Sequence, residues 1–224
     1  MAGAAGTRAG HGALIEDITR RGFLRRTSVL GLAALVASAA PYAQRLLDPP
    51  AALADVNLLD GTMQAFADTI LPGRKVAKTD LGNEVHPLAI AGVDALPGAV
   101  EADALALFHH PLIGFDALEP ALLAELSARS LSQGGDFLDL PFDKRVAVLT
   151  AGLDFDNPSR VVWEAAAAVP FTAFCAAALI RNATAAKASG YHVMGLPGIA
   201  PNGYRDFTYG KKLARERTRK GYLG

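Results

Sequence analysis

The side chains that could carry chemistry in this sequence are five histidines, one cysteine and scattered carboxylates. His109 and His110 are adjacent, and neighbouring residues on a helix point about 100° apart, so this pair cannot chelate one ion as histidines four residues apart can. Pro111 follows the pair, which indicates a helix end, where the helix dipole favours histidine. We therefore expect no metal site in the chain.

The carboxylates and the cysteine have simple structural interpretations. Asp136 with Asp139, and Asp154 with Asp156, fall in predicted loops, where such residues cap helices or face solvent. No pair offers the opposed environments that general acid and general base roles require. Cys175, the only cysteine, cannot form an intrachain disulfide, and its alanine-rich surroundings predict a small buried hydrophobic residue.

Motifs for common cofactors are missing from the sequence. The chain has no glycine-rich phosphate loop and no Gly-x-Ser-x-Gly elbow, so we expect neither nucleotide binding nor a nucleic-acid partner. Without a cysteine pair, neither a structural zinc site nor a covalent haem is expected. The sequence thus predicts no catalytic residue and no cofactor bound by this chain.

Apolar periodicity predicts the helices that would position these residues. The expected helices are 58–71, 87–96, 101–109, 120–131, a helix from Pro141 through Leu153, and 160–188. Residues 161–180 contain eight alanines and one charge, Glu164, which indicates a central helix wrapped by the others. A membrane span is the alternative, but Pro170 and the weak apolarity of alanine disfavour it. We predict an all-α fold with one helical domain at residues 57–189.

The N-terminal 39 residues have the features of a twin-arginine signal peptide. Arg20 and Arg21 precede Phe23 and Leu24, and an apolar run of about 12 residues follows, too short for the roughly 20 residues of a membrane span. Small residues at Ala37 and Ala39 predict cleavage after Ala39. The expected partner is the twin-arginine translocase, and the expected location is extracytoplasmic: periplasmic, secreted, or at the outer face of the cytoplasmic membrane. An uncleaved anchor and a disordered N-terminus are the alternatives.

The segments on either side of the helical domain differ from it in composition. Residues 40–56 are a linker, and residues 190–224 are a loop-rich tail with glycine, proline and aromatic residues that ends in a basic segment. Aromatic residues and arginine on a loop are typical of protein interfaces, although the tail could instead pack on its own domain. The candidate partner-binding residues are Tyr191, His192, Tyr204, Arg205, Phe207, Tyr209 and Arg215.

Several short motifs occur in a characteristic order along the chain. They are an export signal, Phe66-Ala67-Asp68-Thr69-Ile70-Leu71-Pro72, a His-Pro start before Gly92-Val93-Asp94, Phe137-x-x-Leu140 leading to Arg145, and Gly190-Tyr191 with Pro197-Gly198. In this order the sequence resembles the gluconate 2-dehydrogenase subunit 3 family, over most of residues 57–210. Members are small subunits of exported flavoprotein dehydrogenases.

The resemblance implies a non-catalytic subunit that escorts a large flavoprotein subunit of the glucose-methanol-choline type across the membrane, with FAD in that partner. The basic segment Lys211–Lys220 has no counterpart in the family, and the partner's substrate is not implied. Whether a cytochrome subunit completes the complex is left open. The alternatives are an independent extracytoplasmic helical binding or structural protein, and an enzyme with an unrecognised His/Asp site.

Overall fold

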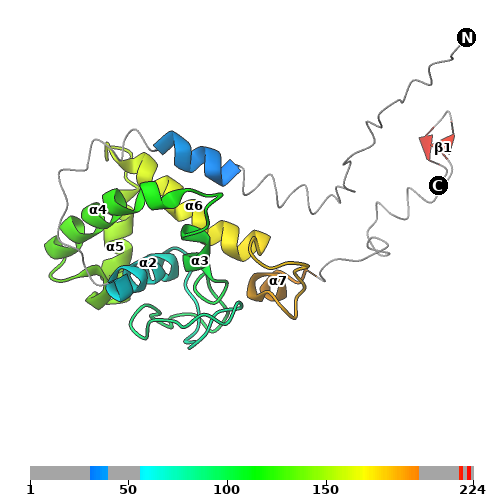
Figure 1. The fold of residues 1–224 in the computed structure, drawn as a ribbon, viewed down its shortest axis with the longest axis horizontal. Helices are drawn as coiled ribbons and strands as arrows, with labels where there is room; N and C mark the ends of the chain where they lie inside the picture. Colours follow the sequence, from blue (N-terminus) through cyan, green and yellow to red (C-terminus); the bar gives the residue numbers. More distant parts are fainter. Residues whose placement is uncertain (1–30, 40–55, 197–216, 219–220, 223–224) are drawn as a thin grey trace, which may run out of the picture.

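The computed structural model describes residues 31–39 and 56–196, and the backbone of two short strands near the C-terminus. The domain is all-α (Figure 1), as the sequence predicts. Its elements are α2 (Val56–Ile70), α3 (Ala104–Phe108), the 3-10 helix η1 (Phe115–Ala117), α4 (Glu119–Ser132), the 3-10 helix η2 (Phe137–Asp139), α5 (Phe142–Gly152), α6 (Arg160–Ala176) and α7 (Ser189–Val193). The strands β1 (Arg217–Thr218) and β2 (Gly221–Tyr222) pair antiparallel.

Helix α6 is central, because it contacts α2, α3, α4, α5 and α7. An aromatic chain marks the core: Phe66 of α2 lies 6.2 Å from Trp163 of α6 and 6.3 Å from Phe108 of α3, measured between ring centroids. Phe108 in turn lies 4.8 Å from Phe115. These four rings are fully buried or nearly so, and rings at such separations attract beyond the area they bury.

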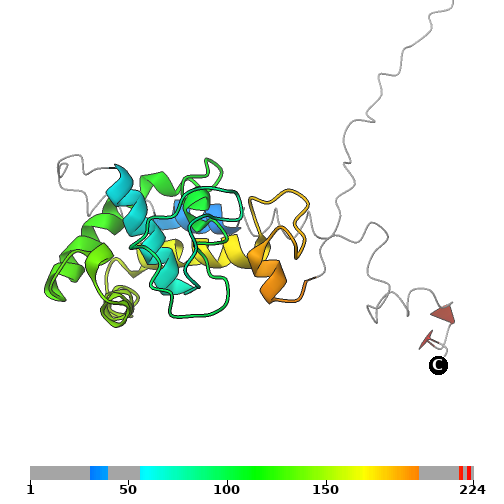
Figure 2. The same cartoon turned by 90° about the horizontal axis from the view of Figure 1, so that it is seen from below.

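A further helix, residues 31–39, lies beside α6 in both views (Figures 1 and 2). Leu32, Val36 and Ala39 are spaced by four and three residues, so they share one face, and all three are buried in the main core. This helix covers most of the apolar run of the predicted signal peptide. Of the two predicted cleavage residues, Ala37 is exposed and Ala39 is buried. Cleavage there stays a prediction.

The helix predicted at residues 87–96 is wrong, because this stretch has turns but no helix. Side chains from elsewhere occupy the backbone groups that a helix would use: Asp68 accepts from the Ala91 amide, and Lys75 donates to the Ile90 carbonyl. Arg145 donates to the carbonyls of Leu88 and Ala89. Apolar periodicity was misleading here because several of these apolar side chains face solvent.

The long segment between α2 and α3 is held in place by contacts at both ends and in its middle. Pro72-Gly73 packs against Pro97-Gly98, where a Cβ on Gly98 would lie 2.6 Å from the Gly73 amide nitrogen. Farther along, Asp103 accepts hydrogen bonds from Thr79 and Asn83, both at 2.7 Å. This segment is therefore ordered by side chains and close backbone packing rather than by helices.

The other predicted helices are confirmed, with corrections at their ends and faces. The apolar residues Leu131 of α4 and Val146 of α5 are exposed. Helix α6 ends at Ala176 rather than near residue 188, because Ala177 adopts a left-handed conformation with φ 44°. Cys175 is exposed, which corrects the expectation of a buried residue. None of the helices in the described ranges has the length and apolar character needed to cross a membrane.

Candidate functional site

The most chemically concentrated group of side chains surrounds His109, which ends α3 as its C-cap. The sequence prediction that the His109-His110 pair ends a helix is confirmed. A tight turn then reverses the chain at Gly114, whose φ of 68° suits glycine. Burial of Phe115 after this turn brings Asp116 of η1, and then Glu119 at the start of α4, next to His109.

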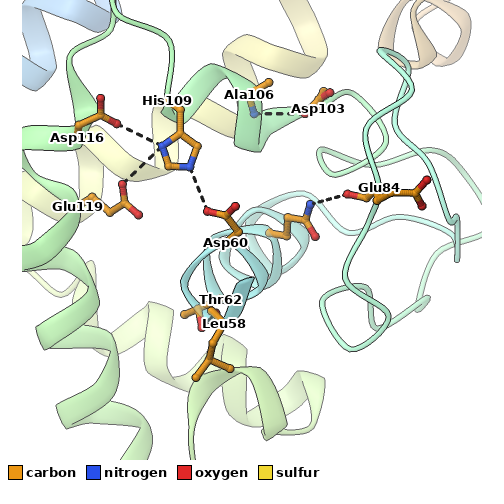
Figure 3. Close-up of polar contacts among 10 residues, drawn as sticks. Leu58, Asp60, Thr62, Glu84, Asp103, Ala106, His109, Asp116 and Glu119 are labelled. Carbon is orange, nitrogen blue, oxygen red and sulfur yellow. Dashed lines mark hydrogen bonds and ion pairs between the residues drawn. The ribbon is translucent and has the colours of Figure 1, made fainter. Parts of the chain in front are cut away.

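Three carboxylates contact the His109 imidazole (Figure 3). Its Nδ1 lies 3.3 Å from Asp116 Oδ1 and 3.7 Å from Glu119 Oε2. Its Nε2 lies 3.3 Å from Oδ1 of Asp60, which α2 contributes from 49 residues earlier in the chain. We call these four residues the His109 cluster. His110 does not join it, because its Nδ1 accepts from the Leu112 amide.

The cluster is partly shielded from solvent, and this shifts two of its pKa values. Burial lowers the pKa of His109, but the hydrogen bond to Asp116 and the charges of Glu119 and Asp60 outweigh it, so the pKa is raised above its ordinary value. Burial also raises the pKa of Glu119, partly offset by the His109 charge. Glu119 is the least accessible of the carboxylates, with 14% of its side chain exposed, whereas Asp116 is 63% exposed.

An imidazole flanked by carboxylates can exchange protons or bind a cation. Sequence reasoning missed this cluster because Asp60 is distant in sequence and because the His109-His110 pair was judged as a unit. One local signal was present: Asp116 and Glu119 are three residues apart, a spacing that puts two side chains on one side of a helical turn. Asp60 had no such signal.

The residues predicted to bind a partner fall into two groups. Tyr191 is buried in a small core of its own domain, and its hydroxyl donates to the Ala176 carbonyl at 3.2 Å, so its ring is not presented to solvent. His192 is exposed on α7. The other predicted partner-binding residues lie outside the residues that the structure describes: Tyr204, Arg205, Phe207, Tyr209 and Arg215. The signal residues Arg20, Arg21, Phe23 and Leu24 also lie outside them.

A second feature is a shallow recess of about 360 Å³ between the segment before α3 and the start of α5. Leu88, Val93 and Phe142 contribute apolar surface to it, and Lys75 and Arg145 lie among its other lining residues. Leu88 is 53% exposed and Val93 is 54% exposed. We call this feature the Leu88 recess. Exposed apolar side chains around a hollow are typical of binding surfaces.

The fold and these features define a small all-α domain with a histidine–carboxylate cluster and a shallow recess of mixed polar and apolar lining beside a buried arginine. The chain belongs to a family of unknown function, DUF5987, which matches residues 58–222. No curated protein matches the chain. No solved structure matches it either.

Proposed function

We propose that this protein is the non-catalytic small subunit and export escort of a flavin-dependent oxidoreductase of the glucose-methanol-choline type. In this proposal the partner subunit carries FAD and performs the chemistry, and this chain carries the signal for the twin-arginine translocase. The observation that carries the proposal is the position of the motif residues behind the family resemblance. They hold the framework of the domain together.

Three of these motif residues illustrate the point. Asp68 accepts hydrogen bonds from the amides of Gly73 and Ala91 and so connects α2 to the segment that follows it. Arg145 is 4% exposed and donates to four backbone carbonyls. Gly190 lies against the backbone of α6. A likeness in residues that determine a fold is better support for shared architecture than a likeness in surface composition.

The Leu88 recess offers a surface for the partner. Leu88 and Val93 of the recess lie on a segment whose backbone is hydrogen-bonded to Asp68 and Arg145, so docking there would cost little conformational entropy. The sequence around the domain is also richer in acidic than in basic residues, since residues 40–204 contain 18 acidic and 10 basic side chains. A partner with an apolar patch rimmed by basic residues would complement this surface.

Co-purification from the exported fraction tests the proposal. A tagged full-length chain should bring down a larger polypeptide whose absorbance spectrum shows bound flavin. Replacing Arg20 and Arg21 by lysine should leave both polypeptides in the cytoplasm, because the partner depends on this signal. A matched control replaces the second arginine pair, Arg25 and Arg26, by lysine and should leave export intact.

Two results would contradict the escort role. One is an exported chain that purifies alone and colourless. The other is a flavoprotein partner that still leaves the cytoplasm when Arg20 and Arg21 are replaced.

A further inference from the structure

We propose that His109, Asp116 and Glu119 bind one divalent transition-metal ion, and that Asp60 is the positioning residue that orients the His109 ring for it. This inference is independent of the proposed escort function. The site lies where the end of α3, η1 and the start of α4 meet, with Asp60 reaching in from α2 (Figure 3).

The first argument is geometric. One ligand atom from each of His109, Asp116 and Glu119 lies within 4.8 Å of the other two. Metal–ligand bonds of about 2.0–2.2 Å at tetrahedral angles place ligand atoms roughly 3.4 Å apart. The distances from His109 Nδ1 to the Asp116 and Glu119 oxygens, 3.3 and 3.7 Å, bracket that separation. An ion could therefore be bound with only small side-chain movements.

The second argument is the orientation of the imidazole. Asp60 contacts Nε2, on the opposite side of the ring from the other two carboxylates. A carboxylate that accepts the Nε2 hydrogen leaves Nδ1 as the nitrogen with a lone pair, and Nδ1 faces Asp116 and Glu119. Carboxylate–histidine–metal arrangements use this same division of roles between the two ring nitrogens. In the neutral ring the metal would take this lone pair directly, and in the protonated ring the Nδ1 proton would first leave to solvent.

The third argument is charge. Three carboxylates surround one imidazole, so even the protonated ring leaves excess negative charge in a partly buried place. Across residues 31–39 and 56–196, no lysine or arginine forms an ion pair with Asp60, Asp116 or Glu119. A divalent cation would neutralise the cluster. The Glu119 carboxylate would gain most, because it is the least accessible of the three, with 14% of its side chain exposed.

The ligand types indicate the class of metal. One imidazole nitrogen with two carboxylate oxygens suits Zn²⁺ or Mn²⁺ better than Ca²⁺ or Mg²⁺, which prefer all-oxygen sites. Asp116 is 63% exposed and His109 is 40% exposed, so solvent reaches the site and water can complete the coordination. We infer a three-ligand site with at least one open position.

Titration of the metal-free full-length chain with Zn²⁺ in a calorimeter tests this inference. We expect one ion bound per chain at the cluster and a rise in melting temperature on binding, since the ion would connect α3, η1 and α4. Glu119→Gln and His109→Gln should each weaken binding at least tenfold and abolish the rise. His110→Gln is the matched control, because it alters the neighbouring histidine outside the cluster, and it should bind as the wild type does.

The positioning role of Asp60 has its own test. Asp60→Asn should weaken Zn²⁺ binding less than Glu119→Gln does, and should change the tautomer of His109 that ¹⁵N NMR of the ring nitrogens reports. Circular dichroism checks that each variant is folded. If His109→Gln does not fold, folded Glu119→Gln alone tests the site. Equal Zn²⁺ affinity in the wild type and in folded Glu119→Gln would overturn the site. An unchanged tautomer in Asp60→Asn would overturn the positioning role.

Discussion

Gly190 of α7 lies against the backbone of Phe174 in α6, so closely that a Cβ on residue 190 would overlap the Phe174 carbonyl oxygen. Only glycine permits this approach. The contact explains why a glycine precedes Tyr191, whose ring packs in the small core beneath α7 and whose hydroxyl bonds to Ala176. The position of α7 on α6 therefore depends on the absence of one methyl group.

Gly190→Ala should reduce the free energy of unfolding by about 1–3 kcal/mol, because the added methyl group would force α7 away from α6. Urea denaturation followed by circular dichroism measures the change. Gly135→Ala is the control, since its Cβ would find its nearest neighbour, Leu140, at an ordinary 3.8 Å. Equal stability of the two variants would show that α7 adjusts freely.

Arg145→Met should destabilise the domain by about 3 kcal/mol or more. The buried guanidinium donates to the carbonyls of Leu88, Ala89, Leu138 and Leu140, and buried acceptors that lose a charged donor are costly. Chemical denaturation measures the loss, and faster amide hydrogen exchange at residues 86–91 would locate it. The same substitution at exposed Arg181 should change stability little. Matching losses at both positions would contradict the anchoring role.

Asp80 should make stability depend on pH. Burial raises the pKa of Asp80 above its ordinary value, and the nearby charges of Glu101 and Asp103 raise this pKa further. The two hydrogen bonds from Ser189 lower the pKa, but they do not cancel the increase. A raised folded-state pKa favours the protonated form, so its stabilising contribution is full below about pH 4 and is lost as pH rises through the folded pKa.

Asp80→Asn removes this titration and can keep both hydrogen bonds to Ser189, which are 2.6 and 2.7 Å long in the wild type. The stability of the wild type relative to this variant should therefore fall as pH rises from about 4. Urea midpoints measured at several pH values test the sign. Curves that stay parallel over the whole range would contradict it.

Cys175 should react with a thiol reagent in the folded protein, because the side chain is exposed. Burial of part of the thiol raises its pKa, so reaction should be slow at neutral pH and accelerate at alkaline pH, where the thiolate forms. Absorbance after addition of an aromatic disulfide reagent follows one thiol per chain, and Cys175→Ser gives the blank. Labelling that requires denaturant would show that the thiol is inaccessible.

Val93→Glu should weaken the complex with the proposed flavoprotein subunit by tenfold or more, equivalent to about 1.4 kcal/mol, because it places a charge in the Leu88 recess. Its side chain is 54% exposed, so the fold should tolerate the change. Leu131→Glu is a control at an apolar position of greater exposure, 62%, at the end of α4. If only the control weakens the complex, the partner binds elsewhere.

Local patterns in the sequence were sufficient for most helices. Apolar spacing and Pro72-Gly73 located α2, and the start of α5 followed from Pro141. The apolar periodicity of these helices and the residues that begin and end them are local features of the chain, so they can be recognised in a single sequence. The length of α6 was overestimated because no breaker follows Ala176 directly, and the left-handed turn at Ala177 is not encoded by a glycine.

The sequence alone determined the all-α class, the central role of α6 and the order of motifs, since these depend on composition and spacing along the chain. Tertiary structure decided the rest. Residues 87–96 are not helical because Asp68 and Arg145, distant in sequence, take their backbone groups. The His109 cluster exists because core packing brings α2 beside the end of α3, and a contact across 49 residues leaves no periodic trace in the sequence.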